Sequence, residues 1–303
     1  MKFLNWWNKF WFEPTDLTGV ALTRIAFGLT LFFTYIFRFE NLNLLTTDAL
    51  VTQDKALFLY PEFMRPSFSW TFWPDSLTFS MHILFCLLIL LWTFGVGGRI
   101  LGIFLWILHM GFIQRNYAIV FGADVMAAVF LFYLVFIKTP GSIKNFSLLK
   151  DPKNFLNKNK ETDWLSLSFY RLLQIQMCVV YAYTGFEKLK GSTWWDGTAL
   201  WSVFANPQMV WIDMSFIQKI PLVIPIIAFL TIVFEIYFPA AVLNKKTRVP
   251  WLLTGVSFHI GIAFLMQLWS FSFVMLAIYF IYLSPEEIKN LFNHFRNKKV
   301  IKG

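Results

Sequence analysis

Apolar stretches about as long as a bilayer is thick alternate with shorter polar segments along most of the chain. A helix needs roughly 20 apolar residues to cross the hydrocarbon core, so each such stretch predicts a membrane-spanning helix. The expected spans are 17–38, 79–97, 100–114, 117–137, 165–188 and 221–243. The last apolar stretch, 249–283, is too long for one span and predicts two, hinged near Trp269-Ser270. The pattern therefore predicts an all-α, polytopic transmembrane helical bundle of about eight spans.

Both ends of the chain carry amphipathic patterns instead of spans. Within residues 1–14, large apolar side chains recur at helical spacing, which is typical of a helix lying on the membrane surface; they are Phe3, Trp6, Trp7, Phe10 and Trp11. Residues 284–303 predict a basic amphipathic tail that starts with Ser284 as N-cap and has Glu287 at the third helical position. The transmembrane domain is expected between them, at 15–283.

The composition is that of a membrane protein. Of the 303 residues, 57% are hydrophobic and 14% are charged, whereas a soluble domain carries about a quarter charged residues. The net charge of +9 would suit a nucleic acid, but the basic residues lie in short loops between apolar spans. The positive-inside rule accounts for them, so we expect a lipid bilayer and no nucleic acid as partner. No Walker loop, dinucleotide-binding glycine pattern or metal-ligand spacing is present in the sequence.

The loop charges also predict how the chain is oriented. If both termini are cytoplasmic, every basic segment falls on the inner side: Arg99, the lysine-rich loop 138–164, the turn at Lys245 and the tail. The acidic loop 39–78 and the aromatic loop at Trp194-Trp195 then lie outside. We expect a multi-pass protein of a bacterial inner membrane.

The fifth span carries a polar stripe inside an apolar segment. At 100° per residue, its members share about a third of the helix circumference; they are Gln174, Cys178, Tyr181, Gly185 and Lys188. Polar groups in hydrocarbon normally face other helices or a cavity. Hydrogen bonding between helices is favoured for Gln174 and Tyr181. Lys188, near the helix end, either extends to the membrane surface or carries chemistry.

The remaining intramembrane ionisable residues separate by depth. Arg24, Arg171 and Glu235 fall toward the inner leaflet, where they predict a structural ion-pair cluster. Asp124 and Lys188 fall toward the outer leaflet, so we expect them to approach each other. An apolar pocket would favour a neutral Lys188 that can act as a base, whereas a nearby carboxylate would favour its charged form. His259 lies near mid-depth, where a lone histidine is more often a packing residue than a catalyst.

Several short motifs occur together in this chain. They are Gly185-Phe-Glu-Lys188-Leu; Trp195-Asp-Gly197-Thr-Ala; Arg115-Asn116 with Gly122 and Asp124; Phe234-Glu235; and Phe258-His259 followed by Phe271-Ser-Phe-Val-Met-Leu276. Their order and spacing resemble those of the vitamin K-dependent γ-carboxylase and its bacterial relatives, the HTTM membrane domains. The resemblance runs from the first span to about residue 283. Membrane proteins for toxin maturation of the sporulation-delaying type look similar as well.

This resemblance implies a role for individual residues. Lys188 matches the lysine that deprotonates vitamin K hydroquinone, and a histidine matches His259; Tyr117 stands where the carboxylase has a histidine. A quinol is thus the implied cofactor or substrate, and its expected binding residues are Asn116, Asp124, Tyr181, Trp194 and Trp195. The large lumenal part that engages a protein substrate in the carboxylase has no counterpart here. Carboxylation of a glutamyl protein is therefore not expected.

Three functional hypotheses follow. The leading one is a quinol-linked or peptide-modifying membrane enzyme whose outward-facing pocket uses Lys188 as base. The second is a non-enzymatic membrane partner that helps mature or export a secreted peptide. The third is a transporter with Asp124, Glu235 and His259 as a proton path; transporters often show repeats or broken helices in matching halves, and the sequence shows none.

Overall fold

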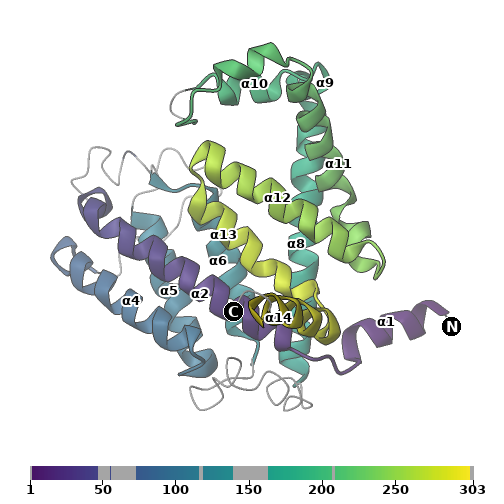
Figure 1. Ribbon diagram of the computed structural model, residues 1–303. Coiled ribbons are helices and arrows are strands. Elements are labelled where there is room, and N and C mark those ends of the chain that lie inside the picture. The colour runs from purple at the N-terminus through teal and green to yellow at the C-terminus, as the bar shows by residue number, and fades with distance from the viewer. Residues whose placement is uncertain are drawn as a thin grey trace. The chain divides into compact units, whose positions relative to one another are not determined.

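The computed structural model describes residues 2–46, 55, 73–115, 119–138, 163–206 and 209–300, and these residues form helices and turns without any strand (Figure 1). The chain divides into two compact units. The first contains residues 1–171 and 284–303, and the second contains residues 172–283. The all-helical fold predicted from the apolar pattern is confirmed within the described residues.

The helices of the first unit follow the predicted spans, except that the fourth is shorter. They are α1 (Lys2–Phe12), α2 (Thr18–Arg38), η1 (Phe39–Leu45), η3 (Asp75–Leu77), α4 (Thr78–Thr93), α5 (Gly98–Arg115), α6 (Gly122–Val135), the start of α8 (Trp164–Lys190) and α14 (Pro285–Val300). Helices α2, α4 and α5 pack around the buried ring of Tyr35, which stacks on Phe85 at 4.0 Å and meets Phe112 edge-on. The predicted cap of α14 is confirmed, because Ser284 and Glu287 exchange backbone-to-side-chain hydrogen bonds of 2.6 and 3.2 Å.

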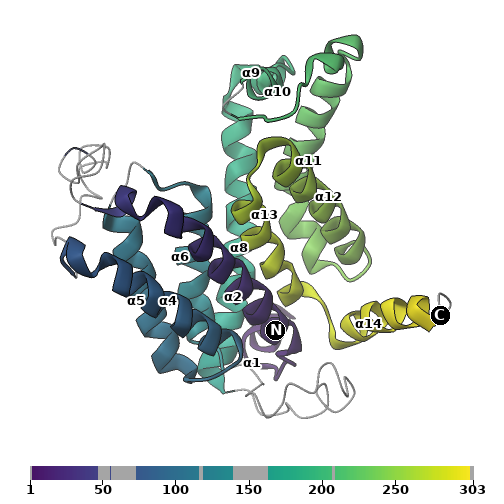
Figure 2. The same ribbon diagram turned by 60° about the vertical axis from the view of Figure 1, so that its left-hand side comes forward.

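The second unit consists of the rest of α8 and the helices that follow it. They are α9 (Ser192–Trp195), α10 (Ala199–Phe204), η6 (Ser215–Lys219), α11 (Val223–Leu243), α12 (Arg248–Met266), α13 (Trp269–Ile278) and η7 (Tyr279–Tyr282). In both views, α9 and α10 lie by the neighbouring ends of α8 and α11 (Figure 2). Helices α12 and α13 form a hairpin whose turn contains Gln267 with φ of 56°. This turn confirms that the last long apolar stretch holds two helices.

Among the described residues, four helical segments are long and apolar enough to cross a membrane: Thr18–Leu45, Asp75–Thr93, Val223–Leu243 and Arg248–Met266. Two shorter apolar helices, Gly122–Val135 and Trp269–Tyr282, accompany them. Large apolar side chains such as Phe79, Leu87, Leu253 and Phe264 are exposed on these elements, as lipid-facing residues are in a bilayer. The chain is thus a multi-pass membrane protein. The number of about eight spans remains a prediction, and the fourth expected span is shorter than predicted.

Candidate functional site

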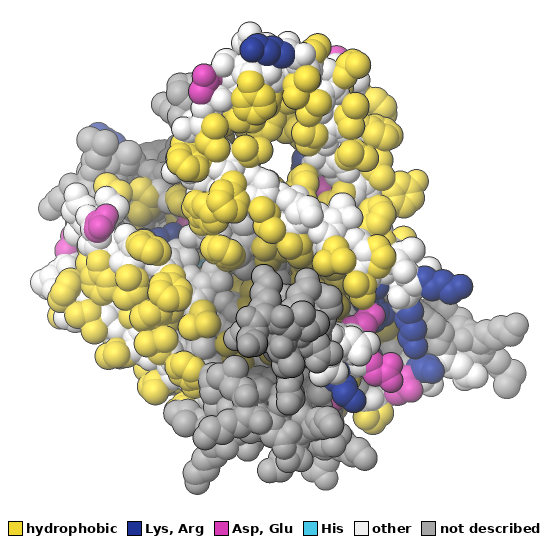
Figure 3. All heavy atoms as spheres, in the orientation of Figure 1, with side chains coloured by type: hydrophobic (Ala, Val, Ile, Leu, Met, Phe, Trp, Pro, Cys, Tyr) yellow, Lys and Arg dark blue, Asp and Glu magenta, His cyan; other side chains and the backbone are white. Residues whose placement is uncertain are grey.

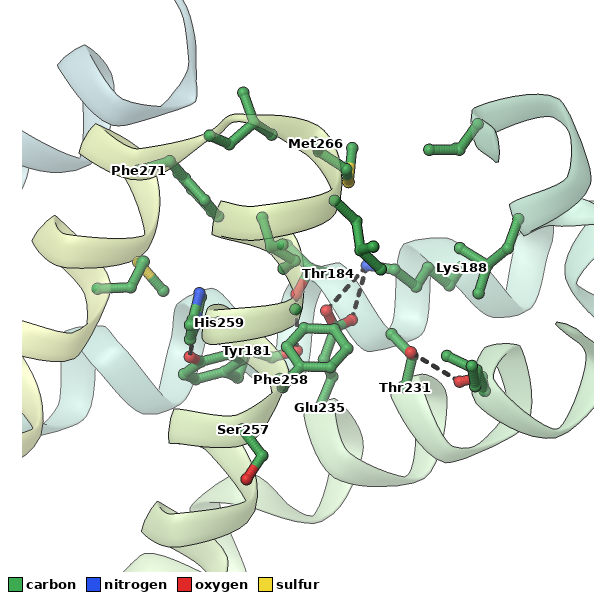
Figure 4. Close-up of a pocket in the computed structure, with 18 of the residues that line it drawn as sticks. Tyr181, Thr184, Lys188, Thr231, Glu235, Ser257, Phe258, His259, Met266 and Phe271 are labelled. Atoms are coloured by element: carbon green, nitrogen blue, oxygen red, sulfur yellow. Dashed lines mark hydrogen bonds and ion pairs between the residues drawn. The ribbon is translucent and has the colours of Figure 1, made fainter. Parts of the chain in front are cut away.

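The centre of the site is an ion pair between α8 and α11. Lys188 Nζ donates to both carboxylate oxygens of Glu235, at 3.0 and 2.7 Å (Figure 4). The Lys188 side chain is 22% exposed and that of Glu235 is 8% exposed. The two helices approach closely here because Gly185 has no side chain: a Cβ at this position would lie 2.8 Å from Ile236 Cγ1 and 3.1 Å from Glu235 Cβ. Gly185 therefore allows the backbones to bring the two charges together.

The expected approach of Asp124 to Lys188 would join the two units and stays a prediction; each residue has an ionic partner within its own unit. Asp124 pairs with Arg38 in the first unit and also accepts a hydrogen bond from the Phe121 backbone at 3.3 Å. It stands in the first turn of α6, where a carboxylate is favoured by the unpaired backbone N–H groups of the helix. A buried hydrogen bond of 2.8 Å joins Tyr35 and His109 beside this pair. Asp124 therefore belongs to the packing of the first unit.

The predicted structural cluster draws Arg24 and Arg171 from the first unit and Glu235 from the second, and it stays a prediction. Arg171 donates to the Phe10 carbonyl at 2.8 Å and to Thr15 Oγ1 at 2.9 Å, so it fastens the end of α1 within the first unit. Arg24 is buried in α2. Glu235 is held by Lys188. Glu235 lies near the middle of α11, about 18 Å from the helix start at 1.5 Å per residue.

The Lys188–Glu235 pair lines a cavity of about 520 Å³ within the second unit. Most of its wall is apolar and comes from α8, α10, α11, α12 and α13, with Phe204, Ile262, Leu265, Phe271 and Met275 among the contributing residues. Thr184 and Thr231 lie beside the pair (Figure 4). Trp194 also lines the cavity, and its ring centroid lies 5.3 Å from Lys188 Nζ, within cation–π distance. The cavity thus combines one charged end with apolar walls.

A second polar group lies in the cavity lining, because Tyr181 and His259 are among the lining residues (Figure 4). The Tyr181 hydroxyl is hydrogen-bonded both to His259 Nε2, at 2.7 Å, and to the Tyr279 hydroxyl, at 2.6 Å. All three side chains are buried. Gln174 donates to the Ile281 carbonyl at 3.0 Å. These bonds confirm that Gln174 and Tyr181 join helices, and they show that His259 Nε2 is occupied by a protein partner.

The other residues expected to bind the quinol or to act in catalysis do not line the cavity or lie outside the described residues. Trp195 is 72% exposed and donates from Nε1 to the Leu189 carbonyl, so only its neighbour Trp194 lines the cavity. Asn116 and Tyr117 lie outside the described residues. No group of three or more potential metal ligands occurs in the part of the chain that the structure describes.

Two features of the site were not found by sequence reasoning. They are the partner of Lys188 and the two threonines that line the cavity beside the ion pair, Thr184 and Thr231. One signal for the first was available. Gly185 precedes Lys188 by three residues, on the same helix face, and small residues in membrane helices mark close contacts with another helix. The close helix contact at Gly185 therefore pointed to a carboxylate on another span, such as Glu235, as the partner of Lys188.

The sequence profile described as the HTTM domain matches residues 12–286. The chain belongs to the HTTM domain family. Among curated proteins, the sporulation-delaying protein SdpB of Bacillus subtilis is 27% identical over 216 residues, covering 68% of this chain and 65% of SdpB, just under two thirds of that protein. YitO of the same species is 28% identical over 232 residues, covering 72% of each chain. No solved structure matches the chain.

Proposed function

We propose that this HTTM protein is a membrane enzyme that deprotonates a lipid-soluble hydroxyl compound of the quinol type in the cavity of the second unit. The observation that carries the proposal is the Lys188–Glu235 pair, which lies in an otherwise apolar cavity within reach of a ligand. Intramembrane charges are costly and usually mark a function. A pair that only stabilised packing would have no need of a cavity beside it.

The chemistry of the pair suits proton transfer. In surroundings with little water, the ammonium of Lys188 can pass one proton to Glu235, which leaves a neutral amine beside a neutral carboxylic acid. The amine then accepts the proton of the substrate hydroxyl, and the resulting ammonium stabilises the oxyanion that forms. The Trp194 ring, 5.3 Å from Lys188 Nζ, stabilises this ammonium by a cation–π contact.

The cavity fits a quinol in size and in lining. Its volume of about 520 Å³ falls within the usual range of small-molecule sites, roughly 300–1,000 Å³. Trp194, Phe258 and Phe271 provide aromatic surfaces against which a ring can pack. The resemblance of Gly185–Leu189 to the carboxylase lysine motif supports the same ligand class.

Co-purification tests the proposed ligand. Organic extracts of wild-type protein should contain a quinol or phenol near one equivalent, identified by mass spectrometry, and extracts of Lys188→Met/Glu235→Leu should lack it. Identical extracts that hold only bulk phospholipid would contradict the proposal. Recovery of a secreted peptide from wild type alone would favour the non-enzymatic partner function.

We also propose the orientation with both termini in the cytoplasm of a bacterial inner membrane, on the basis of the loop charges. Ser192 and Lys246 are both exposed and lie at opposite ends of α11 and its neighbours. In intact cells, a cysteine at Ser192 should react with an impermeant maleimide, whereas one at Lys246 should react only after lysis. Labelling of the cysteine at Lys246 but not of the one at Ser192 in intact cells would show the opposite orientation.

A further inference from the structure

Tyr279, Tyr181 and His259 form a buried chain of hydrogen bonds at the wall of the cavity. The Tyr181 hydroxyl lies 2.7 Å from His259 Nε2 and 2.6 Å from the Tyr279 hydroxyl (Figure 4). Tyr181 and His259 line the cavity, whereas Tyr279 does not. The other ring nitrogen of the histidine, Nδ1, is buried and has no hydrogen-bond partner among the described residues. The chain therefore ends in an unpaired polar atom of a side chain that lines the cavity.

The fold makes room for the hydroxyl at the other end of the chain. A Cβ at Gly255 would lie 2.3 Å from the Tyr279 hydroxyl oxygen and 2.8 Å from Tyr279 Cε2, so a side chain at this position would displace the tyrosine. Glycine inside a helix such as α12 is less favourable than alanine. Gly255 therefore keeps the Tyr279 hydroxyl within reach of Tyr181.

The lengths of the bonds indicate the direction of donation. A hydroxyl donor gives a bond of about 2.7–2.8 Å, whereas an N–H donor usually gives about 2.9–3.0 Å. The 2.7 Å contact therefore favours Tyr181 as the donor to His259 Nε2. The Tyr181 proton is then used, so Tyr181 accepts from Tyr279, and a neutral His259 carries its proton on Nδ1.

The places of the unpaired groups favour the same direction. If His259 Nε2 donated to Tyr181 and Tyr181 to Tyr279, the Tyr279 proton would have no acceptor among the described residues, away from the cavity. A buried donor without an acceptor is costly. In the favoured direction the one unpaired donor is Nδ1–H of His259, a residue of the cavity wall, where a ligand can supply the acceptor.

We propose that Tyr279 is a positioning residue, which acts through Tyr181 to keep the His259 proton on Nδ1, and that this N–H is a second point at which the cavity binds its ligand. The inference rests on the proposed function for the group held at Lys188. It adds a requirement on the ligand: besides the hydroxyl at Lys188, the molecule carries a second oxygen that accepts a hydrogen bond.

The position of the His259 proton is tested by ¹⁵N nuclear magnetic resonance of histidine-labelled protein in nanodiscs. Phe258–His259 is the only Phe–His step in the sequence, so additional carbonyl labelling of phenylalanine identifies the signal. Wild type should show a protonated Nδ1 and an unprotonated Nε2. Tyr279→Phe should populate the form with the proton on Nε2, because the Tyr181 oxygen is then free to accept from it.

The second binding point is tested with two phenols of similar size, 4-methoxyphenol and 4-ethylphenol, of which only the first has an acceptor oxygen opposite its hydroxyl. Calorimetry should show that wild type binds 4-methoxyphenol about fivefold more tightly, as one hydrogen bond typically gives. Tyr279→Phe should lower this preference to about twofold, because the competent form of His259 is only partly populated. Binding of 4-ethylphenol should not change.

Tyr282→Phe is the matched control. Tyr282 lies in the same helix η7, and its buried hydroxyl donates to the Gln174 carbonyl at 2.7 Å, away from the cavity. Its replacement should alter neither the His259 signal nor the preference between the phenols. An equal loss of preference in Tyr282→Phe and Tyr279→Phe would overturn the positioning role.

Two results with wild type alone also overturn the inference, so it stays testable even if Tyr279→Phe does not fold. They are a proton on Nε2 of His259 and equal binding of the two phenols. Wild-type protein that binds neither phenol contradicts the proposed function, while the histidine spectrum still tests the chain of hydrogen bonds.

Discussion

Lys188→Met is expected to lower the free energy of unfolding by about 3–5 kcal/mol, because it leaves a carboxylate without its partner inside the protein. The carboxylate is that of Glu235, whose side chain is only 8% exposed and which receives two hydrogen bonds from Lys188. Thermal or detergent unfolding of the protein in nanodiscs, followed by circular dichroism, gives the measurement.

The double variant Lys188→Met/Glu235→Leu is the decisive control. Replacing both members of a buried ion pair by apolar residues of similar size is often neutral for stability, so the double variant should regain most of the loss. The neighbouring pair Lys190–Glu187 serves as an exposed comparison, since both side chains face solvent; Lys190→Met should leave the melting curve unchanged. A double variant as unstable as Lys188→Met would show that the charges are not coupled.

The helices could be predicted from the sequence because hydrophobic periodicity and length determine them. The predicted span 165–188 became α8, Trp164–Lys190, and the predicted span 221–243 became α11, Val223–Leu243. The capping residues of α14 were also predictable, since a side-chain cap involves only residues close in sequence. These features depend on local interactions, which one sequence contains in full.

The pairing of charges could not be predicted from the same information. Loop charge gives the orientation of each span, and the position of a residue within its span then gives its approximate depth in the membrane. Neither gives the neighbour that its helix face meets. Asp124 and Lys188 were both placed toward the outer leaflet, yet they pair with Arg38 and Glu235. These contacts join residues 86 and 47 positions apart in the chain, and only the packing of the helices brings them together.

The polar stripe of α8 contains one feature that could be predicted from the sequence and one that could not. Its direction toward other helices was predictable, because polar groups avoid lipid, and Gln174 and Tyr181 do bond to such helices. The enclosure of His259 by Tyr181 was not predictable, since a lone histidine in a span gives no sign of its partner. The sequence therefore indicated which face of α8 is important. The structure shows that Gln174 on this face packs against another helix, whereas Tyr181 and Lys188 line the cavity.

Lys188→Arg is the change expected to have the largest effect on activity. Arginine can still pair with Glu235, through a fork of two hydrogen bonds, so the charge balance of the site is retained. Arginine cannot release its proton near neutral pH, so no neutral base is left to accept a proton from the substrate. Loss of a positioned general base typically lowers the rate about 10²–10⁴-fold. We expect a loss of that size in a folded protein.

Lys190→Ala is the matched control for this substitution. Lys190 lies two residues further along α8, is exposed, and pairs with Glu187 outside the cavity. Its replacement removes a lysine from the same helix end without touching the cavity, so turnover should be unchanged. A loss in both variants would point to the general charge of this surface instead of the base at Lys188.

The most direct measurement is oxygen uptake by purified protein in nanodiscs with added quinol, because a deprotonated quinol passes two electrons to dioxygen and yields quinone and hydrogen peroxide; uptake above the uncatalysed rate reports the deprotonation. Wild type and Lys190→Ala should show equal turnover, and turnover by Lys188→Arg should fall about 10²–10⁴-fold while it melts at the wild-type temperature. Full turnover by Lys188→Arg would contradict the assignment of Lys188 as the base and would leave it only the role of an ion-pair partner to Glu235.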